Sequence, residues 1–251
     1  MTAFAALSTA NYKASVRDKT TVFFTFAFPL LFLVVFGLIF AGQEVEGSGR
    51  NYIDYIAPGV LSWGVGNAAL FGIAFTLMQW RNDDILRLIR MTPTPLTTVL
   101  ASRYTGALVI GLVQAVLFVG VALLPAFGLS LAGSWPLALP VLLLGVTAFL
   151  SMGVVVGSRA NTPEAVAAIA NSIMVPMAFL SGSFLPIDLM PAWLQNISRA
   201  LPLRYMNDGI STALTGSGDL ATIGLSSAAL AGFTVVFGVL AVRTFRWSNN
   251  S

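Results

Sequence analysis

The chain has 251 residues, of which 57% are hydrophobic and 9% are charged, and its formal net charge is +3. A mean hydropathy of +0.85 is too high for a soluble domain of this length, so the composition indicates an integral membrane protein. A small basic excess in such a protein is typical of cytoplasmic loops rather than of nucleic-acid binding. The absence of cysteine and histidine excludes disulfides, thiolate and imidazole metal ligands, and any Ser–His or Cys–His catalytic dyad.

The N-terminal stretch FAALSTANYKASVRDK, residues 4–19, is compatible with a helix that has a basic end. Its apolar and aromatic positions include Phe4, Leu7 and Tyr12, and the cations Lys13 and Arg17 follow them. A helix of this kind can lie along the inner leaflet, with its cations against anionic headgroups. The sequence therefore predicts an interfacial helix before the first span.

Six apolar stretches are long enough to cross a bilayer, which takes about 20 residues per helix. They cover residues 21–41, 57–80, 104–127, 135–156, 165–185 and 220–242. The first is uncharged from Thr20 to Gln43, which exceeds the roughly 7–15 residues of a signal-peptide core, so we expect it to be retained. The sequence thus predicts an all-α polytopic membrane protein, with residues 1–251 forming a single transmembrane domain.

Aromatic and amide side chains within these spans have a packing interpretation and a transport interpretation. The first span carries a phenylalanine at every fourth position: Phe28, Phe32, Phe36 and Phe40. Three amides also fall within spans: Asn67, Gln114 and Asn171. An i,i+4 aromatic stripe is more often a packing or lipid-facing surface than a drug site. Buried amides more often make interhelical hydrogen bonds, worth about 1 kcal/mol, than cargo contacts.

The segment RNDDILRLIRMTPTP, residues 81–95, separates the second and third spans and is unusually charged for this chain. On a helix over residues 83–91, one arc is apolar: Ile85, Leu86, Leu88 and Ile89. The opposite side is charged, with Asp84 at its edge: Asp83, Arg87 and Arg90. Asp83 and Arg87 have the i,i+4 spacing of an ion pair, and the sequence Thr92-Pro93 ends the helix. The pattern predicts a two-turn amphipathic helix, which physics alone would place on lipid headgroups.

The segment FLSGSFLPIDLMPAWLQNISRALPLRYMNDGI, residues 179–210, precedes the last span. It has an apolar stripe at Met190, Trp193, Leu194, Ile197 and Leu201, which Pro202 interrupts. A second stripe begins at Leu203, Met206, Ile210 and Leu214. Neither stripe is long enough to cross a bilayer. We expect two short helices that re-enter the outer leaflet with their ends covered by protein, acting either as an outer gate or as a packing hairpin.

Basic residues set the predicted orientation. With the N-terminus inside, the inner side holds ten of them: Lys13, Arg17, Lys19, Arg81, Arg87, Arg90, Arg103, Arg159, Arg243 and Arg246. The outer side holds three: Arg50, Arg199 and Arg204. This positive-inside bias predicts that both termini, and residues 81–95, face the cytoplasm.

Taken together, these features resemble the permease subunit of the ABC-2 exporter family. The family's "L..LR.TP" segment is matched by Leu86, Ile89, Arg90, Thr92 and Pro93. Its "SG…P…P.w…..P" pattern is matched by Ser181, Gly182, Pro186, Pro191, Trp193 and Pro202. Two positions depart from the family: Asp84 stands where relatives often have glycine, and Ser211, shortly after Asp208, stands near a frequent arginine. The resemblance covers essentially the whole chain, and its compact layout is similar to that of daunorubicin-type permeases.

The resemblance implies roles for these segments. Residues 83–90 with Thr92 and Pro93 would be a coupling helix that docks on a separate ATPase, the N-terminal helix would help to hold that ATPase, and Ser181 to Asp208 would form the outer gate. The assembly would hold two permease subunits, as a homodimer or a heterodimer, and two ATPase subunits in the bacterial inner membrane. It would move amphiphilic cargo such as a drug, a lipid or a lipid-linked glycan.

ATP and Mg would bind to the partner, because a P-loop needs lysine after its glycines and neither Lys13 nor Lys19 follows such a loop. We therefore expect no catalytic residue, cofactor or metal site in this chain. An ion-coupled secondary transporter is the main alternative, although such transporters usually carry ionisable groups within their spans. An intramembrane protease is disfavoured by the absence of histidine and of paired membrane aspartates, and a channel by the absence of a filter-like sequence.

Overall fold

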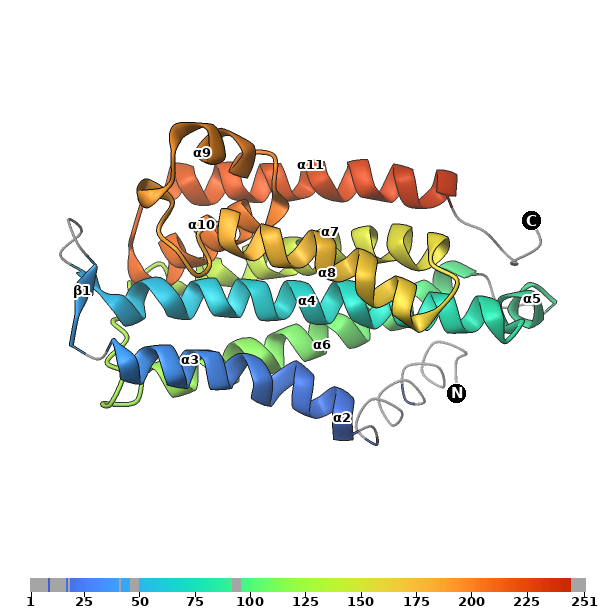
Figure 1. Ribbon diagram of the computed structural model, residues 1–251, viewed down its shortest axis with the longest axis horizontal. Helices are drawn as coiled ribbons and strands as arrows, with labels where there is room; N and C mark the ends of the chain where they lie inside the picture. Colours follow the sequence, from blue (N-terminus) through green and yellow to red (C-terminus); the bar gives the residue numbers. More distant parts are fainter. Residues whose placement is uncertain are drawn as a thin grey trace.

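The computed structural model describes residues 19–40, 42–45, 50–91 and 96–244, together with the isolated positions 9 and 17. Within these ranges the chain forms a bundle of long helices (Figure 1), six of which are long and apolar enough to span a membrane. The predicted all-α polytopic membrane fold is therefore confirmed. The spanning segments are α2 (Lys19–Val22) continued by the π-helix η1 (Phe23–Ala27) and α3 (Phe28–Ile39), then α4 (Tyr52–Asn82), α6 (Leu96–Ala122), α7 (Ala138–Arg159), α8 (Pro163–Leu180) and α11 (Leu220–Thr244).

Shorter elements connect these helices. They are the paired strands β1 (Glu44–Val45) and β2 (Arg50–Asn51), then α5 (Ile85–Arg90), η2 (Trp135–Leu137), η3 (Ile187–Leu189), α9 (Ala192–Ser198) and α10 (Pro202–Thr215). The strands pair antiparallel, with Glu44 opposite Asn51. Figure 1 shows α5 at one end of the bundle and β1 and α9 towards the other. We call these the α5 end and the α9 end.

Several helices begin or end away from the predicted limits, for identifiable reasons. The third span starts at Leu96 rather than at residue 104, because Arg103 does not end the helix but places its guanidinium over the Trp80 ring, 4.8 Å from the centroid. The fifth span ends at Leu180 rather than at residue 185, because Gly182 takes a left-handed φ of +79°. The second span starts at Tyr52 rather than at residue 57, with Asp54 in its first turn, where a carboxylate suits the helix dipole.

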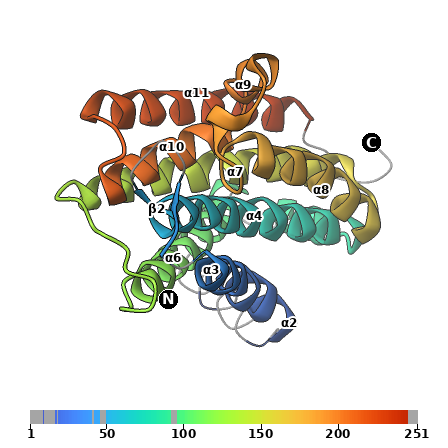
Figure 2. The same cartoon turned by 60° about the vertical axis from the view of Figure 1, so that its left-hand side comes forward.

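Helix α4 runs through the middle of the bundle, and Figure 2 shows α3 and α8 on either side of it. Its closest neighbour is α7. A Cβ added to Gly153 would lie 2.5 Å from the Leu70 carbonyl oxygen, and one added to Gly157 would lie 2.6 Å from the Ala74 carbonyl oxygen. The two glycines form a G-x-x-x-G face that lets the two backbones touch. Helices α4 and α7 therefore form a tightly packed pair.

Helix α10 lies inside the bundle, against α4, α7 and α11. The second apolar stripe predicted from the sequence is buried here, at Leu203, Met206, Ile210 and Leu214. Gly145 on α7 makes room for it, since a Cβ there would lie 2.5 Å from the Met206 sulfur. Protein thus covers this short helix, as a polar backbone within a membrane requires.

Candidate functional site

The hinge between α4 and α5 differs from the predicted helix over residues 83–91. Asp83 and Asp84 form a turn, and α5 begins at Ile85. Asp84 has φ of 56°, and among the described residues no other non-glycine residue has positive φ. The predicted ion pair between Asp83 and Arg87 is not formed, because Asp83 precedes the helix instead of lying one turn before Arg87 on it. A left-handed backbone favours glycine, so this conformation is compatible with the glycine that the family resemblance implies at the position of Asp84.

Helix α5 buries one side and exposes apolar side chains on another. Leu86 is 1% exposed, whereas Leu88 is 61% and Met91 71% exposed. Ile85 and Ile89 are half-buried and Arg87 is exposed. Leu88 and Leu86 lie at opposite edges of the predicted apolar arc, and only the Leu86 edge is buried in the bundle. What the exposed part of the arc contacts stays a prediction. The side chain of Arg90, and Thr92 and Pro93, lie outside the described residues.

Directly before the hinge, the end of α4 is tied to the turn between α7 and α8. The buried Arg81 donates hydrogen bonds to the carbonyl oxygens of Ser158 and Ala160 and to the Asn161 Oδ1, the last at 3.0 Å. The Asn82 Nδ2 donates to the Asn161 carbonyl oxygen at 2.9 Å. Cations are favourable at carbonyls that end a helix. The sequence analysis counted Arg81 only as a topology charge and missed this role.

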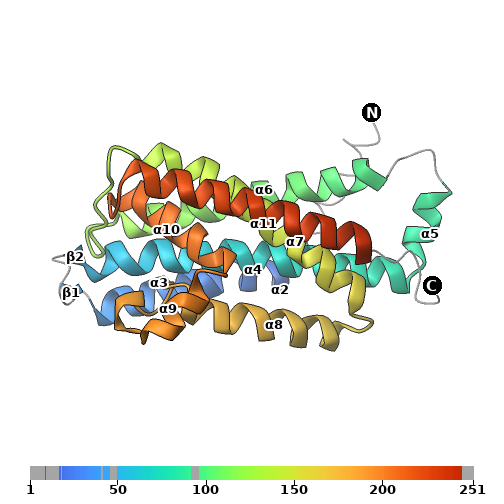
Figure 3. The ribbon, with the colours of Figure 1, turned by 90° about the horizontal axis from the view of Figure 1, so that it is seen from above.

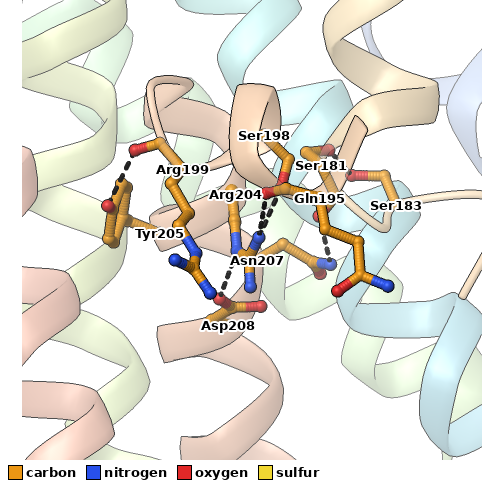
Figure 4. Close-up of polar contacts among 9 residues, drawn as sticks. All are labelled: Ser181, Ser183, Gln195, Ser198, Arg199, Arg204, Tyr205, Asn207 and Asp208. Carbon is orange, nitrogen blue, oxygen red and sulfur yellow. Dashed lines mark hydrogen bonds and ion pairs between the residues drawn. The ribbon is translucent and has the colours of Figure 1, made fainter. Parts of the chain in front are cut away.

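At the α9 end, the loop after α8 is held by two other helices. The Tyr55 hydroxyl on α4 donates to the Gly182 carbonyl oxygen. The Asn207 Nδ2 on α10 donates to the Ser181 carbonyl oxygen at 3.4 Å (Figure 4). The Ser181 and Ser183 hydroxyls lie 2.9 Å apart. All three loop residues, Ser181 to Ser183, are buried, so the loop is part of the packed bundle.

Arg204 joins α9 to α10. Its Nε lies 3.4 Å from the Asp208 Oδ2, and its Nη1 donates to the Gln195 carbonyl oxygen at 3.2 Å and to the Ser198 hydroxyl (Figure 4). Burial raises the pKa of Asp208, while the Arg204 charge and hydrogen bond oppose that shift. Arg204 and Asp208 lie one turn apart in α10, so the ion pair at this end forms within a single helix.

The remaining residues predicted for the gate lie around this cluster. Pro186 precedes η3, Pro191 precedes α9, and Pro202 is the first residue of α10, the position at which proline suits a helix. Trp193 is exposed on α9. The structure therefore bonds Ser181 to Asn207, Gly182 to Tyr55 and Asp208 to Arg204. None of these three partners was predicted as a gate residue.

Aromatic residues of the first span pack inside the bundle. The Phe32 ring lies 5.9 Å from Trp63 and 5.8 Å from Phe184, and the Phe36 ring 6.4 Å from Phe184, between centroids. Edge and tilted contacts of this kind stabilise aromatic clusters. Phe184 directly follows the loop at the α9 end, so this cluster connects α3 and α4 to that loop.

The three span amides lie in different surroundings. Gln114 is fully buried against Gly64, and neither its Oε1 nor its Nε2 has a hydrogen-bond partner among the described residues. Asn67 is half-buried and Asn171 is exposed on α8. The interhelical hydrogen bond predicted for Gln114 is therefore not formed within the described chain, whereas Asn207, which was not predicted, does form one.

The predicted N-terminal interfacial helix lies almost entirely outside the described residues. Phe4, Leu7, Tyr12 and Lys13 are among those outside, and Arg17 is described as helical and exposed. The role proposed for this segment stays a prediction.

Comparison with known proteins connects this arrangement to a family. Residues 2–215 match the family described as "ABC-2 type transporter". The chain is 23% identical over 212 residues to the inner membrane transport permease YadH of Escherichia coli (strain K12). This match covers 84% of this chain and 78% of YadH. It is 26% identical over 245 residues to the daunorubicin resistance ABC transporter permease protein DrrB1 of Streptomyces coeruleorubidus, covering 88% of this chain and 78% of DrrB1. It is 24% identical over 208 residues to the putative transport permease YvfS of Bacillus subtilis (strain 168), and the match covers 80% of this chain and 81% of YvfS. As its motifs predicted, the chain belongs to the ABC-2 type transporter family and is a multi-pass transport permease subunit of the inner membrane.

Proposed function

We propose that this chain is the membrane subunit of an ATP-driven exporter and that α5 docks on a separate ABC ATPase. The observation that carries the proposal is the exposed apolar tip of α5. Leu88 and Met91 are 61% and 71% exposed at the end of a bundle whose neighbouring polar groups are bonded to one another. Exposed apolar groups of this kind beside a fixed polar anchor suit insertion into a groove on a partner.

The energy for transport would come from ATP hydrolysis by the partner ATPase. ATP and Mg would bind to the ATPase, two copies of which serve two permease subunits. The α5 end and both termini would face the cytoplasm, consistent with the basic residues gathered there. The cargo would be amphiphilic, as a drug, a lipid or a lipid-linked glycan is, and the name of DrrB1 supports a drug as one member of this class.

A second permease subunit would cover the face of α8 that bears Asn171. Asn171 and Ser172 are exposed on a membrane-spanning helix, next to the exposed Val175 and Phe179. An amide that faces lipid is unfavourable, so protein is the better neighbour for this face. A second copy of this chain, or a related permease in a heterodimer, would supply it.

Docking is tested by giving the α5 tip two charges. The variant Leu88→Asp/Met91→Asp, co-expressed with the cognate ABC ATPase, is expected to insert normally and to lose the co-purified ATPase, because a carboxylate buried in an apolar groove is strongly unfavourable. Leu189→Asp, at the α9 end and 68% exposed, is the matched control and should retain the ATPase. Equal recovery of the ATPase with both variants would contradict the docking role of α5.

The energy source is tested in inverted vesicles with a fluorescent amphiphilic dye. Transport by the permease–ATPase complex should require hydrolysable ATP and continue when proton and sodium gradients are collapsed. Transport driven by an ion gradient without ATP would instead support the secondary-transporter alternative.

Orientation is tested with single cysteines, which the native chain lacks. In intact cells, Ser217→Cys should react with an impermeant maleimide, and Asp83→Cys should react only after the membrane is opened. The reverse pattern would overturn the proposed orientation.

A further inference from the structure

We infer that Arg81 is a positioning residue that ties the coupling helix α5 to helix α8, so that a displacement of α5 reaches the loop at the α9 end through α8. The inference rests on the proposed function, because it needs α5 to receive a push from an ATPase. Three steps lead from α5 to the far end of the bundle.

The first step connects α5 to Arg81. The backbone N–H of Asp84 donates to the Arg81 carbonyl oxygen at 3.4 Å, and the N–H of Leu88 donates to the Asp84 carbonyl oxygen at 3.0 Å. Helix α5 also packs against α4, and Leu86 is buried. A push on the exposed Leu88 and Met91 therefore acts first on the last turn of α4, where Arg81 lies.

The second step connects Arg81 to the turn between α7 and α8. Its guanidinium bonds two carbonyl oxygens and one side-chain oxygen, all between Ser158 and Asn161. The planar guanidinium holds several acceptors at once in a fixed geometry, which a lysine ammonium does not reproduce. Asn82 adds a further bond to the same turn. These bonds are directional, so the turn follows the end of α4 when that end moves.

The third step connects the turn to the far end. Thr162 caps α8 by accepting a hydrogen bond from the Ala165 N–H at 3.2 Å. From there α8 runs alongside α4 (Figure 3) to the loop at Ser181. Along its length it buries an apolar stripe: Val166, Ala170, Met174 and Met177. Apolar packing alone permits packed helices to slide past one another. The hydrogen bonds from Arg81 oppose such sliding between α8 and the end of α4.

Helices α4 and α7 reinforce this route. Gly153 and Gly157 bring the α7 backbone against α4, and Arg81 holds the end of α7 through the Ser158 carbonyl oxygen. The pair therefore moves as one body, and α8 joins it through the turn that Arg81 binds. At the far end, the loop that α8 carries is bonded to Tyr55 and Asn207, which is where a movement of α8 would break or remake contacts.

The test uses the full permease–ATPase complex in proteoliposomes, with a cysteine reporter, Leu185→Cys, at an exposed position just past the loop. The rate of labelling by an impermeant maleimide is compared without nucleotide and after trapping with ATP and vanadate. The otherwise wild-type complex should change this rate about fivefold or more, the lower range of ordinary allosteric coupling. With Arg81→Gln, the ATPase should still co-purify and hydrolyse ATP, but the two labelling rates should agree to within about twofold.

Matched variants separate positioning from a loss of charge or fold. Arg159→Gln removes an exposed arginine beside the same turn and should behave as wild type. Arg81→Lys should give an intermediate response, because it keeps the charge but loses the multiple bonds. Cross-linking Asn82→Cys to Asn161→Cys with a short bis-thiosulfonate reagent, in the Arg81→Gln background, should restore ATP-dependent dye transport. Transport is measured without the Leu185→Cys reporter, because the reagent would also modify that cysteine.

Each outcome decides a different claim. A wild-type response from Arg81→Gln, with the ATPase bound, would overturn the role of Arg81. If Arg81→Gln does not assemble, Arg81→Lys takes its place, since it keeps the charge but loses the fixed set of bonds; an undiminished response would then overturn the inference. If the otherwise wild-type reporter complex retains no ATPase or shows no nucleotide response, the proposed function fails instead, independently of Arg81.

Discussion

The two ends of the bundle are built in opposite ways. At the α9 end, polar groups from α4, α9 and α10 bond to one another, and the loop Ser181–Ser183 is buried. At the α5 end, Arg81 and Asn82 in the last turn of α4 are bonded to the turn before α8, and Leu88 and Met91 beyond them are exposed. Exposed apolar side chains occur at both ends, since Leu189 and Trp193 are exposed at the α9 end. The difference is that the α9 end also contains a buried loop bonded within the chain, whereas the α5 end is a short helix with an exposed apolar tip.

The difference fits the proposed docking role of α5 and the outer gate that the family resemblance implies for the α9 end. An outer gate would have to hold itself closed, so its contacts would lie within the chain. A docking helix must pass a displacement on to the spans. It therefore needs firm bonds where it joins α4, as at Arg81, and an exposed apolar surface, as at Leu88 and Met91. The comparison predicts that substitutions in the bonded cluster at the α9 end act mainly on the stability of the permease. Substitutions at the exposed tip of α5, at Leu88 and Met91, should act mainly on binding of the ATPase.

The largest stability effect should come from Gly59, where α4 meets the loop Ser181–Ser183. A Cβ added there would overlap the backbone of Ser183, so Gly59→Ala should lower the apparent Tm in detergent, with a loss of about 1–3 kcal/mol from overpacking. Gly72→Ala is the matched control in the same helix, because nothing lies within 4 Å of a Cβ at Gly72. It should be neutral or slightly stabilising, since alanine favours a helix more than glycine does. An equal Tm for both variants would contradict the close packing of this loop.

The next effect concerns Arg204, which bonds α9 and Asp208 together. Arg204→Gln leaves Asp208 without its cation and α9 without two hydrogen bonds, so we expect a loss of about 1–3 kcal/mol. The apparent Tm should fall while co-purification of the ATPase is unchanged. Arg199→Gln is the control, because the backbone carbonyl of Arg199, and not its guanidinium, accepts the bond from Tyr205. A loss of the ATPase with Arg204→Gln would show that the two ends are not separable in this way.

Periodicity and proline positions were enough to predict much of the fold. The six spans follow from apolar length, and the break between α9 and α10 follows from Pro202, which interrupts one apolar stripe before the next begins. These signals are local, because each depends on neighbours within a few residues. The helix limits shifted where a distant contact intervened, as Arg103 did by stacking on Trp80.

The parts of the site that were missed depend on residues far apart in the chain. Arg81 reaches acceptors 77 to 80 positions later, and nothing in its own neighbourhood distinguishes it from an ordinary cytoplasmic arginine. Asn207 reaches Ser181 across 26 positions. The turn at Asp84 was also missed, because a helical projection of residues 83–91 cannot show a left-handed residue within it. The family's preference for glycine at that position was the signal that could have revealed it.

A smaller effect at the α5 end should follow from Asp84→Gly. Glycine adopts φ of 56° without the steric cost that a side chain has there, so the hinge should gain about 0.5–1 kcal/mol. Trypsin cleavage at the exposed Arg87 requires local opening of α5, so it should slow about two- to fivefold. The global Tm should not change, and Asp84→Val should speed the cleavage. Faster cleavage with glycine would mean that Asp84 makes a stabilising contact that outweighs its backbone strain.

The smallest effect is the pH dependence of Asp208 at the α9 end. Burial raises the pKa of Asp208 in the folded state above that of an unfolded aspartate, so the folded protein binds more protons in the window between the two values. The stabilising contribution of Asp208, relative to a neutral residue, is therefore fully present below the unfolded pKa and is lost as the pH rises through the raised folded pKa. The effect should be modest, because 34% of the side chain is exposed and Arg204 opposes the shift.

The measurement is the apparent Tm of wild type and Asp208→Asn in detergent between pH 4 and pH 7. Asparagine keeps the shape of the side chain but does not titrate, so the difference between the two Tm values reports on Asp208 alone. The Tm of wild type relative to Asp208→Asn should fall as the pH rises. A relative Tm that instead increases with pH would mean that the ion pair with Arg204 outweighs burial, because the ionised form would then be the more stable one in the folded protein. The α9 end would in that case be held together by charge rather than by packing, which would reverse the account of how the gate stays closed.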